Sequence, residues 1–257
     1  MKFAPVINAL AIPPGALVDQ RVPKKLLLEQ GAPTAGDKRQ IQDGIEDMIW
    51  VAALKPTNIG VPIFRNEERE YLEIAVLTAS LRSAAKPNRL IELIHRAIPY
   101  PLVLVAAHGD TISLSLAHKR WSQGEIGKVV IEDLHRTAPF RPDSPKTEET
   151  LFLASLAVSQ LPTRDLFALY QGWLDRLAAL EAAQITGTFA PPASADGVAL
   201  RSSLDTHARL LREIAVLRAQ AEKEKQINRR VELNLEMKRL EAELAVIGQS
   251  LRCREDI

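Results

Sequence analysis

The order of apolar and polar positions predicts four strands in the middle of the chain. Residues 71–79 and 102–107 are almost continuously apolar, which is typical of strands that are covered on both faces. Residues 111–118 alternate strictly between apolar and polar side chains, and a short turn at His108-Gly109-Asp110 precedes them. Two strand patterns joined by a short loop that contains glycine predict an antiparallel hairpin. Residues 128–134 supply the fourth strand pattern.

Apolar positions at helical spacing flank these strands. They predict a helix over 38–54 that begins at an N-cap Asp37 and a second helix over 88–97, and further helices within 147–185. The chain therefore predicts an α/β (α+β) fold, in which a mixed sheet of about four strands is flanked by helices and followed by a C-terminal helical region. The predicted division is an α/β domain with an extended N-terminal arm (1–140), a helical extension (147–185), a linker rich in proline and small residues (186–200), and a long amphipathic helix (201–257).

The last quarter of the chain has the pattern of one long coiled-coil-like helix from about Ser203 to Leu251. Its apolar positions recur at steps of three and four and form a narrow seam, which such a helix buries against another helix. The seam consists of Leu210, Ile214, Leu217, Ala221, Met237, Leu240, Leu244, Ile247 and Leu251. The charged stretch 222–230 separates two parts that do not share a heptad frame, so the pattern leaves open a kink, a shift of phase, or a helix of which only part packs as a coiled coil. It also leaves open that the helix folds back on its own domain.

Composition restricts the classes of protein that the chain can belong to. The 33 basic and 32 acidic residues give a net charge of +1, which argues against a protein that grips nucleic acid over a wide surface. Cys253 is the only cysteine, so the chain has no internal disulfide and no zinc site built from cysteines. The N-terminus lacks the pattern of a signal peptide, and no apolar run reaches the roughly 20 residues that span a bilayer. We therefore expect a cytoplasmic protein without membrane partners.

A small set of basic residues is the candidate for nucleic-acid contact. Lys119 and Arg120 precede Trp121, so that cations for phosphates stand beside an aromatic ring for stacking. The full set is Arg21, Lys24, Lys25, Lys55, Lys119 and Arg120. The alternative is a solvated face, which the balanced net charge favours.

Four of the five histidines lie close together in the sequence and offer a second candidate site. His95, His108 and His118, with Asp110 and Asp133, could form a metal or acid–base site, and His135 and Glu132 lie nearby. None of the spacings matches a known ligand motif, so the sequence predicts no metal, no cofactor and no catalytic residue. The acidic-x-Lys motif of a restriction-type nuclease is also not met: Ala75 follows Glu73 where the lysine would stand, and Ala117 precedes Lys119 where the acid would stand.

Several segments resemble a bacterial family of unknown activity, the domain-of-unknown-function family numbered 4391. The matching pieces are RVPKKLL (21–27), IEDMIWVAALKPTNIGV (45–61), EYLEIAVLTASL (70–81), LIELIHRAIPYPLVLVA (90–106) and LAHKRW (116–121). Members of this family are often encoded beside helicases and DNA methyltransferases, in loci that look like restriction-modification or phage-defence islands. The resemblance implies an accessory role in such a system, and it carries no catalytic residues over to this chain.

These observations lead to one main expectation and two alternatives. The main expectation is a non-catalytic accessory or adaptor protein that assembles through its C-terminal helix, either with itself or with a helicase or methyltransferase subunit. The first alternative is a nucleic-acid-binding subunit that works with such a partner. The second is a metal-dependent hydrolase or nuclease.

Overall fold

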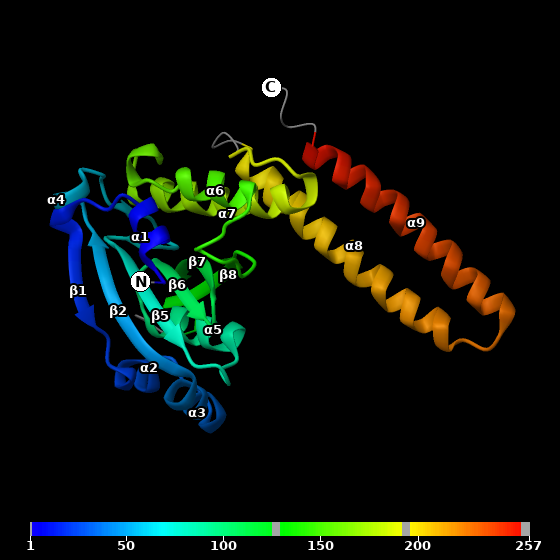
Figure 1. The fold of residues 1–257 in the computed structure, drawn as a ribbon, viewed down its shortest axis with the longest axis horizontal. Helices are drawn as coiled ribbons and strands as arrows, with labels where there is room; N and C mark the ends of the chain where they lie inside the picture. Colours follow the sequence, from blue (N-terminus) through cyan, green and yellow to red (C-terminus); the bar gives the residue numbers. More distant parts are fainter. Residues whose placement is uncertain (1, 125–128, 192–195, 253–257) are drawn as a thin grey trace. The chain divides into compact units, whose positions relative to one another are not determined.

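The computed structural model describes residues 2–124, 129–191 and 196–252 (Figure 1). The chain forms two compact units, residues 1–177 and residues 178–257. Cys253 lies outside the described residues.

A six-stranded mixed sheet forms the centre of the first unit. Its strand order is β1-β2-β5-β6-β7-β8; the neighbours β5 and β6 pair in parallel, and the other neighbouring strands pair antiparallel. The strands are β1 (Leu17–Arg21), β2 (Ile45–Leu54), β5 (Ile74–Leu81), β6 (Leu102–His108), β7 (Thr111–Trp121) and β8 (Val129–Arg136). A separate hairpin pairs β3 (Phe64–Arg65) with β4 (Glu70–Tyr71). The mixed α/β class is thus confirmed, with six strands in the main sheet where the sequence predicted about four.

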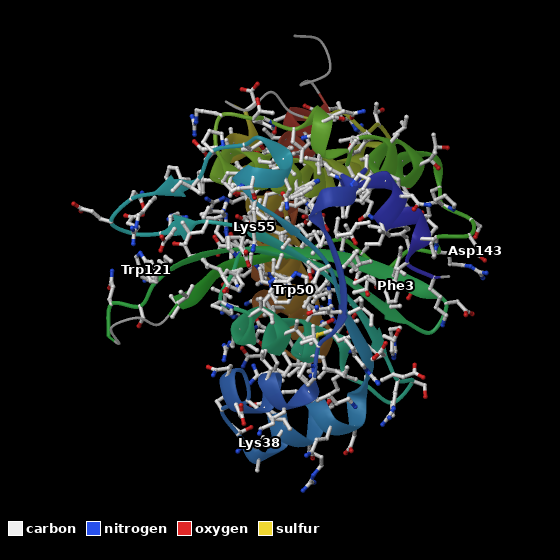
Figure 2. All side chains as sticks on the ribbon, turned by 90° about the vertical axis from the view of Figure 1, so that its left-hand side faces the viewer. Phe3, Lys38, Trp50, Lys55, Trp121 and Asp143 are labelled. Atoms are coloured by element: carbon white, nitrogen blue, oxygen red, sulfur yellow. The ribbon has the colours of Figure 1, made fainter. Side chains whose placement is uncertain are left out.

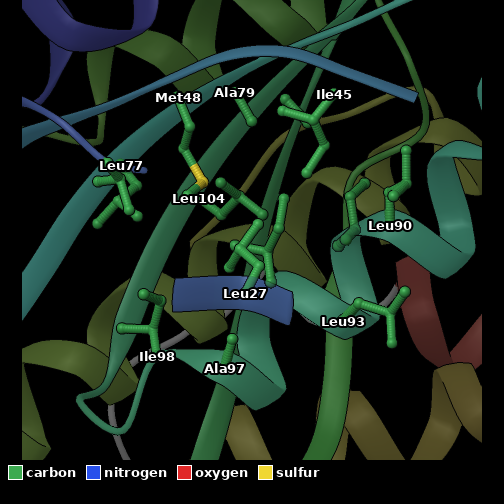
Figure 3. Packing of buried hydrophobic residues seen from close by; sticks show 14 of the residues in the cluster. Leu27, Ile45, Met48, Leu77, Ala79, Leu90, Leu93, Ala97, Ile98 and Leu104 are labelled. Carbon is green, nitrogen blue, oxygen red and sulfur yellow. The ribbon is translucent and has the colours of Figure 1, made fainter. Parts of the chain in front are cut away.

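One face of the sheet packs against three helices. Parallel strands need a crossover, and α5 (Pro87–Ala97) supplies it between β5 and β6. Leu90, Ile91, Leu93 and Ile94 of α5 are fully buried or nearly so, in a cluster that also contains Leu27. Leu27 belongs to α2 (Lys24–Gln30), and α3 (Ala35–Gly44) adds Ile41 to the same cluster. Figure 3 shows part of this packing.

The predicted hairpin is confirmed by β6 and β7. His108 pairs with Thr111, and Gly109 has a φ of +61°, a conformation that glycine adopts without strain. The β6–β7 pairing runs from there to Leu104 and Ser115.

The helix predicted over 38–54 is wrong in its second half. The helix α3 begins after Thr34, whose hydroxyl accepts the Asp37 N–H, and it ends at Gly44, so Thr34 and not Asp37 is the N-cap. Residues 45–54 form β2, which pairs with β1 on one side and β5 on the other. The β-branched and aromatic residues of this segment, such as Ile49 and Trp50, suit a strand, and pairing on both sides outweighs the helical spacing of its apolar positions.

The remaining elements of the first unit are short helices and the first half of a long one. They are α1 (Ala4–Ala9), a 3-10 turn (Pro14–Ala16), α4 (Pro56–Ile59), α6 (Thr147–Ala154), a second 3-10 turn (Val158–Gln160) and α7 (Leu166–Thr186). The first half of α7 is anchored to the sheet by Tyr170. The Tyr170 hydroxyl accepts the Ala117 N–H at 2.9 Å, and it lies 2.8 Å from the Leu102 carbonyl oxygen and 3.0 Å from that of Ala117. These atoms lie just beyond the last β6–β7 pair, so the hydroxyl takes the place of the next ladder partner.

The second unit contains a hairpin of two helices where the sequence predicted one. These are α8 (Gly197–Lys223) and α9 (Ile227–Arg252), which pack along each other (Figure 1). Glu224, with φ −74° and ψ 126°, leaves the helical conformation and begins the turn, within the charged stretch that separated the two parts of the seam. The turn contains neither glycine nor proline. The reversal is stabilised instead by the two halves of the seam, which bury each other once the helices pack side by side.

The predicted seam is therefore buried within the chain. Leu210, Ile214 and Leu240 form the centre of a cluster, and Leu217, Met237, Leu244 and Ile247 pack against it. A second cluster joins Leu251 to Leu200, Leu204, Ala178 and Ala182. Ala221 is also buried. An ion pair of 3.5 Å between Arg218 of α8 and Glu241 of α9 crosses the hairpin.

Candidate functional site

A pocket of about 240 Å³ lies at the end of the sheet where β6 begins and β7 ends. We call it the Lys119 pocket. Its lining joins cationic, aromatic and aliphatic side chains from four parts of the chain: β4 and its neighbours, the turn before β6, the end of β7, and the start of β8. The lining residues are Arg69, Glu70, Leu72, Pro99, Tyr100, Pro101, Lys119, Arg120, Trp121 and Val129.

Lys119 is a buried cation in the wall of this pocket. It is only 3% exposed, and its ammonium donates to the carbonyl oxygen of His95 at 2.7 Å and to that of Ile98. These carbonyls end α5, so Lys119 satisfies groups that a helix C-terminus leaves without an intrahelical partner. Burial lowers the pKa of Lys119 to about 7. Among the described residues, no carboxylate forms an ion pair with Lys119, so the carbonyl dipoles alone compensate its charge.

Two arginines beside Lys119 share one carboxylate. Arg69 lies 2.9 Å and Arg120 3.5 Å from the Glu132 carboxylate. Arg69 also contacts Glu68 at 3.1 Å, and its guanidinium lies 5.6 Å from the centre of the Phe167 ring. These contacts fix Arg69, whose side chain is 15% exposed, whereas Arg120 is 38% exposed and closer to solvent.

Aromatic side chains give the pocket a flat, apolar part. Tyr100 is 38% exposed, and its ring centre lies 6.1 Å from that of Trp50. The backbone N–H of Trp121 donates to the carbonyl oxygen of Glu68 at 2.8 Å, which ties the end of β7 to the turn of the β3–β4 hairpin. Aromatic rings next to cations can bind a planar ligand that carries negative charge, since the ring stacks on the aromatic side chain and the charge lies near the cation.

A hydrogen-bonded chain of side chains lies beside the pocket, and Lys119 is not part of it. Gln171 donates to Asp175 at 2.9 Å, so its amide oxygen accepts from His118 Nε2 at 2.8 Å. His118 Nδ1 is then the acceptor for the Tyr71 hydroxyl. Burial raises the pKa of Tyr71, which keeps that hydroxyl a neutral donor. Because both ring nitrogens of His118 are engaged, this histidine serves to join β7 to α7.

The predicted basic residues do not gather in one patch. Lys119 and Arg120 meet in the pocket, but Arg21 pairs with Asp47 at 2.7 Å, and the Lys24 ammonium donates to the Gln42 carbonyl oxygen at 2.9 Å. Lys25 pairs with Glu29 along α2, and Lys55 pairs with Glu73 at 3.0 Å. Figure 2 shows Lys55 and Trp121 at separate places on the surface.

The histidines likewise make separate contacts. His95 is fully buried, and its Nε2 lies 3.0 Å from the Ser115 hydroxyl. Burial, and to a lesser extent the charge of Lys119, lowers the pKa of His95 well below its usual value, so the ring is neutral. His108 contacts the Ser83 carbonyl oxygen at 3.1 Å. Within residues 2–124, 129–191 and 196–252, no three His, Cys, Asp or Glu side chains are grouped to hold a metal ion.

The outer side of α9 carries a second apolar stripe, which we call the outer stripe. Ile227, Val231, Leu235 and Val246 are 51–69% exposed, and Ala242 lies between them on the same side. At about 100° per residue, these positions fall within one arc of about 100°, roughly half a turn away from the buried seam. The hairpin thus buries one apolar side of α9 and leaves the other exposed.

Comparison with known proteins identifies the family. The sequence profile described as "Domain of unknown function (DUF4391)" matches residues 10–244. The chain belongs to this family. No curated protein and no solved structure matches the chain. The match to DUF4391 covers the sheet, the Lys119 pocket and most of the helical hairpin. In the part of the chain that the structure describes, no helix is long and apolar enough to cross a membrane.

Sequence reasoning missed several residues of the site. Arg69 and Tyr100 line the pocket, and Tyr170 and Gln171 hold the strand that carries Lys119. Tyr100 lies in the Ile-Pro-Tyr-Pro segment, where two prolines around one aromatic residue are a local signal for a fixed turn. Arg69 gives no such signal, because only the folding of the β3–β4 hairpin over the end of β7 brings it to the pocket.

Proposed function

We propose that this protein is a non-catalytic accessory component of a bacterial restriction-modification-like or phage-defence system, and that it assembles through its C-terminal hairpin. The outer stripe of α9 is the observation that supports this proposal. The stripe carries four large, exposed apolar side chains, with Lys238 and Ala242 between Leu235 and Val246, on a helix that is already packed on its other side, and this favours a further partner.

The partner that fits the outer stripe best is the α9 of a second copy, lying antiparallel. In a two-fold antiparallel pair, charged residues on one flank of the stripe meet the same flank of the other helix. Glu232 and Arg239 lie on the same flank of the outer stripe, two turns apart. Placing Val231 opposite Ala242 of the second copy brings Glu232 of each copy close to Arg239 of the other. Each chain then supplies both charges, and the pairing forms twice.

This arrangement can be tested by light scattering of the full chain at concentrations from about 1 to 100 µM, the range in which modest interfaces dissociate. We expect a mass near twice 28.4 kDa. Glu232→Arg alone and Arg239→Glu alone each place like charges opposite each other twice, so each variant is expected to be a monomer. An equimolar mixture of the two variants restores both pairings and is expected to be a heterodimer.

Two outcomes would count against the proposal. A wild-type chain that stays at 28.4 kDa over the whole range would exclude self-association through the outer stripe. A wild-type dimer that neither charge change weakens would place the interface elsewhere. Arg229→Glu is the matched control, because Arg229 pairs with Glu232 along the same helix at 2.6 Å but lies away from the outer stripe.

A further inference from the structure

We propose that the Lys119 pocket binds a nucleotide unit, with its phosphate near Arg120 and Lys119 and its base against Trp121 and Tyr100. This proposal is independent of assembly through the hairpin, because all of its residues belong to the first unit. It assigns a ligand to Lys119 and Arg120, the two predicted nucleic-acid contacts that line this pocket.

The balance of charge in the pocket favours an anion. Glu68 and Glu132 balance the charges of Arg69 and Arg120, whereas the ammonium of Lys119 is held by backbone carbonyls without a carboxylate partner among the described residues. Glu70, the acid in the lining, pairs with Arg65 at 3.3 Å. Burial lowers the pKa of Lys119 to about 7, so an anion that enters next to it favours the protonated form and interacts with it more strongly than with a cation at an open surface.

The shape and chemistry of the lining select the rest of the ligand. A cavity of about 240 Å³ lies just below the roughly 300–1,000 Å³ of ordinary ligand pockets, so it is small for a dinucleotide or a large cofactor and suits one nucleotide unit better. The exposed Tyr100 ring and Trp121 offer stacking faces, and Leu72, 46% exposed, and Pro101 add apolar surface. A flat ring attached to a phosphate uses both parts of the lining.

Such a unit comes either as a free mononucleotide or as part of a single strand of nucleic acid. Calorimetric titration of the full chain at low salt with AMP, with CMP and with a short single-stranded oligonucleotide separates the two sources. Saturable binding of a mononucleotide supports a small-molecule site, whereas binding of the oligonucleotide alone supports a strand-binding site. In both cases we expect Arg120→Gln and Trp121→Ala each to weaken binding about tenfold or more, by loss of a charge-assisted contact and of a stacking face respectively.

The variants are chosen so that folding and binding can be told apart. Arg120→Gln is the primary variant, because the Arg120 side chain is partly exposed and its loss should not disturb folding. Lys119→Met also removes the cap of α5, so its binding is compared with that of the wild type only if the two circular dichroism spectra match. Arg141→Gln is the control, because it removes an exposed arginine paired with Asp143, and Figure 2 shows Asp143 and Trp121 on opposite sides of the molecule.

Three results would overturn the assignment. The first is that neither a mononucleotide nor the oligonucleotide binds at millimolar concentration. The second is that Arg120→Gln and Arg141→Gln weaken binding equally, which would indicate a diffuse electrostatic effect. The third is that inorganic phosphate binds as tightly as the nucleotides, which would remove the role of the aromatic rings.

Discussion

Replacing Tyr170 with Phe should destabilise the first unit by removing one oxygen atom. The side chain is fully buried, and burial raises the pKa of its hydroxyl well above the usual value, so this group is a neutral hydrogen-bonding partner at any working pH. Without it, the buried N–H of Ala117 has no acceptor, and the Leu102 carbonyl loses its donor. An unsatisfied buried donor costs about 1–3 kcal/mol, and the lost bond to the carbonyl adds about 1 kcal/mol, so we expect a loss of about 2–4 kcal/mol.

Differential scanning calorimetry of the full chain measures this effect. For a chain of this size, a loss of about 2–4 kcal/mol corresponds to a decrease of about 4–16 °C in the midpoint of the transition. Tyr100→Phe is the matched control, because its hydroxyl is on an exposed side chain, and we expect its midpoint to equal that of the wild type. If Tyr170→Phe also leaves the midpoint unchanged, the hydroxyl does not act as a ladder partner for β6 and β7, and the reasoning fails.

Two further substitutions test the packing and the acid stability of the first unit. Gly31→Ala would place a Cβ 2.7 Å from the Leu93 carbonyl oxygen, and we expect a loss of about 1–3 kcal/mol in urea unfolding. Gly36→Ala, whose Cβ would meet only the Thr34 hydroxyl at an ordinary van der Waals distance of 3.7 Å, should be neutral or slightly stabilising. The hydrogen bonds from Arg89, and then that from Thr34, lower the pKa of Asp37 to about 2, so its contribution to stability is complete above about pH 4 and is lost as the pH falls towards 2. Asp37→Asn should therefore flatten the stability profile between pH 4 and pH 2, and an unchanged slope there would contradict this assignment.

The central strands could be predicted from the sequence because their burial leaves an unambiguous pattern. Residues 102–107 are covered on both faces, and every side chain from Leu102 to Ala107 is buried, as a continuous apolar run indicates. The alternation after Gly109 likewise predicted both β7 and its hairpin with β6. In these segments, the local pattern and the tertiary structure require the same residues.

The strand β2 could not be predicted in this way, because its pattern satisfies two structures at once. Ile41, Ile45 and Met48 recur at steps that suit a helix, and all three are buried in the same cluster although the helix ends at Gly44. The pairing of β2 with β1 and β5, which decides the outcome, involves residues that are distant in sequence. Short-range spacing carries no information about that pairing.

The helical hairpin and the Lys119 pocket show the same limit of prediction from the sequence, because both depend on contacts between distant parts of the chain. The apolar seam predicts a helix surface that is buried against another helix, and in the structure that other helix is the second half of the same segment. In the pocket, Lys119 and Arg120 were identified from their position beside Trp121. Arg69 and Tyr100 were missed, because they reach the pocket only through the packing of the β3–β4 hairpin and the turn before β6.

The helix α7 has a practical consequence for dissecting this protein. It runs without interruption from Leu166 to Thr186, so the boundary between the two compact units, after Leu177, falls within a helix. A chain truncated before α8 would keep Ala178 and Ala182 but lose Leu200, Leu204 and Leu251, which cover them. The newly exposed apolar surface would itself promote association and aggregation. Substitutions at the surface of α9 therefore give a cleaner measure of self-association than deletion of the hairpin does.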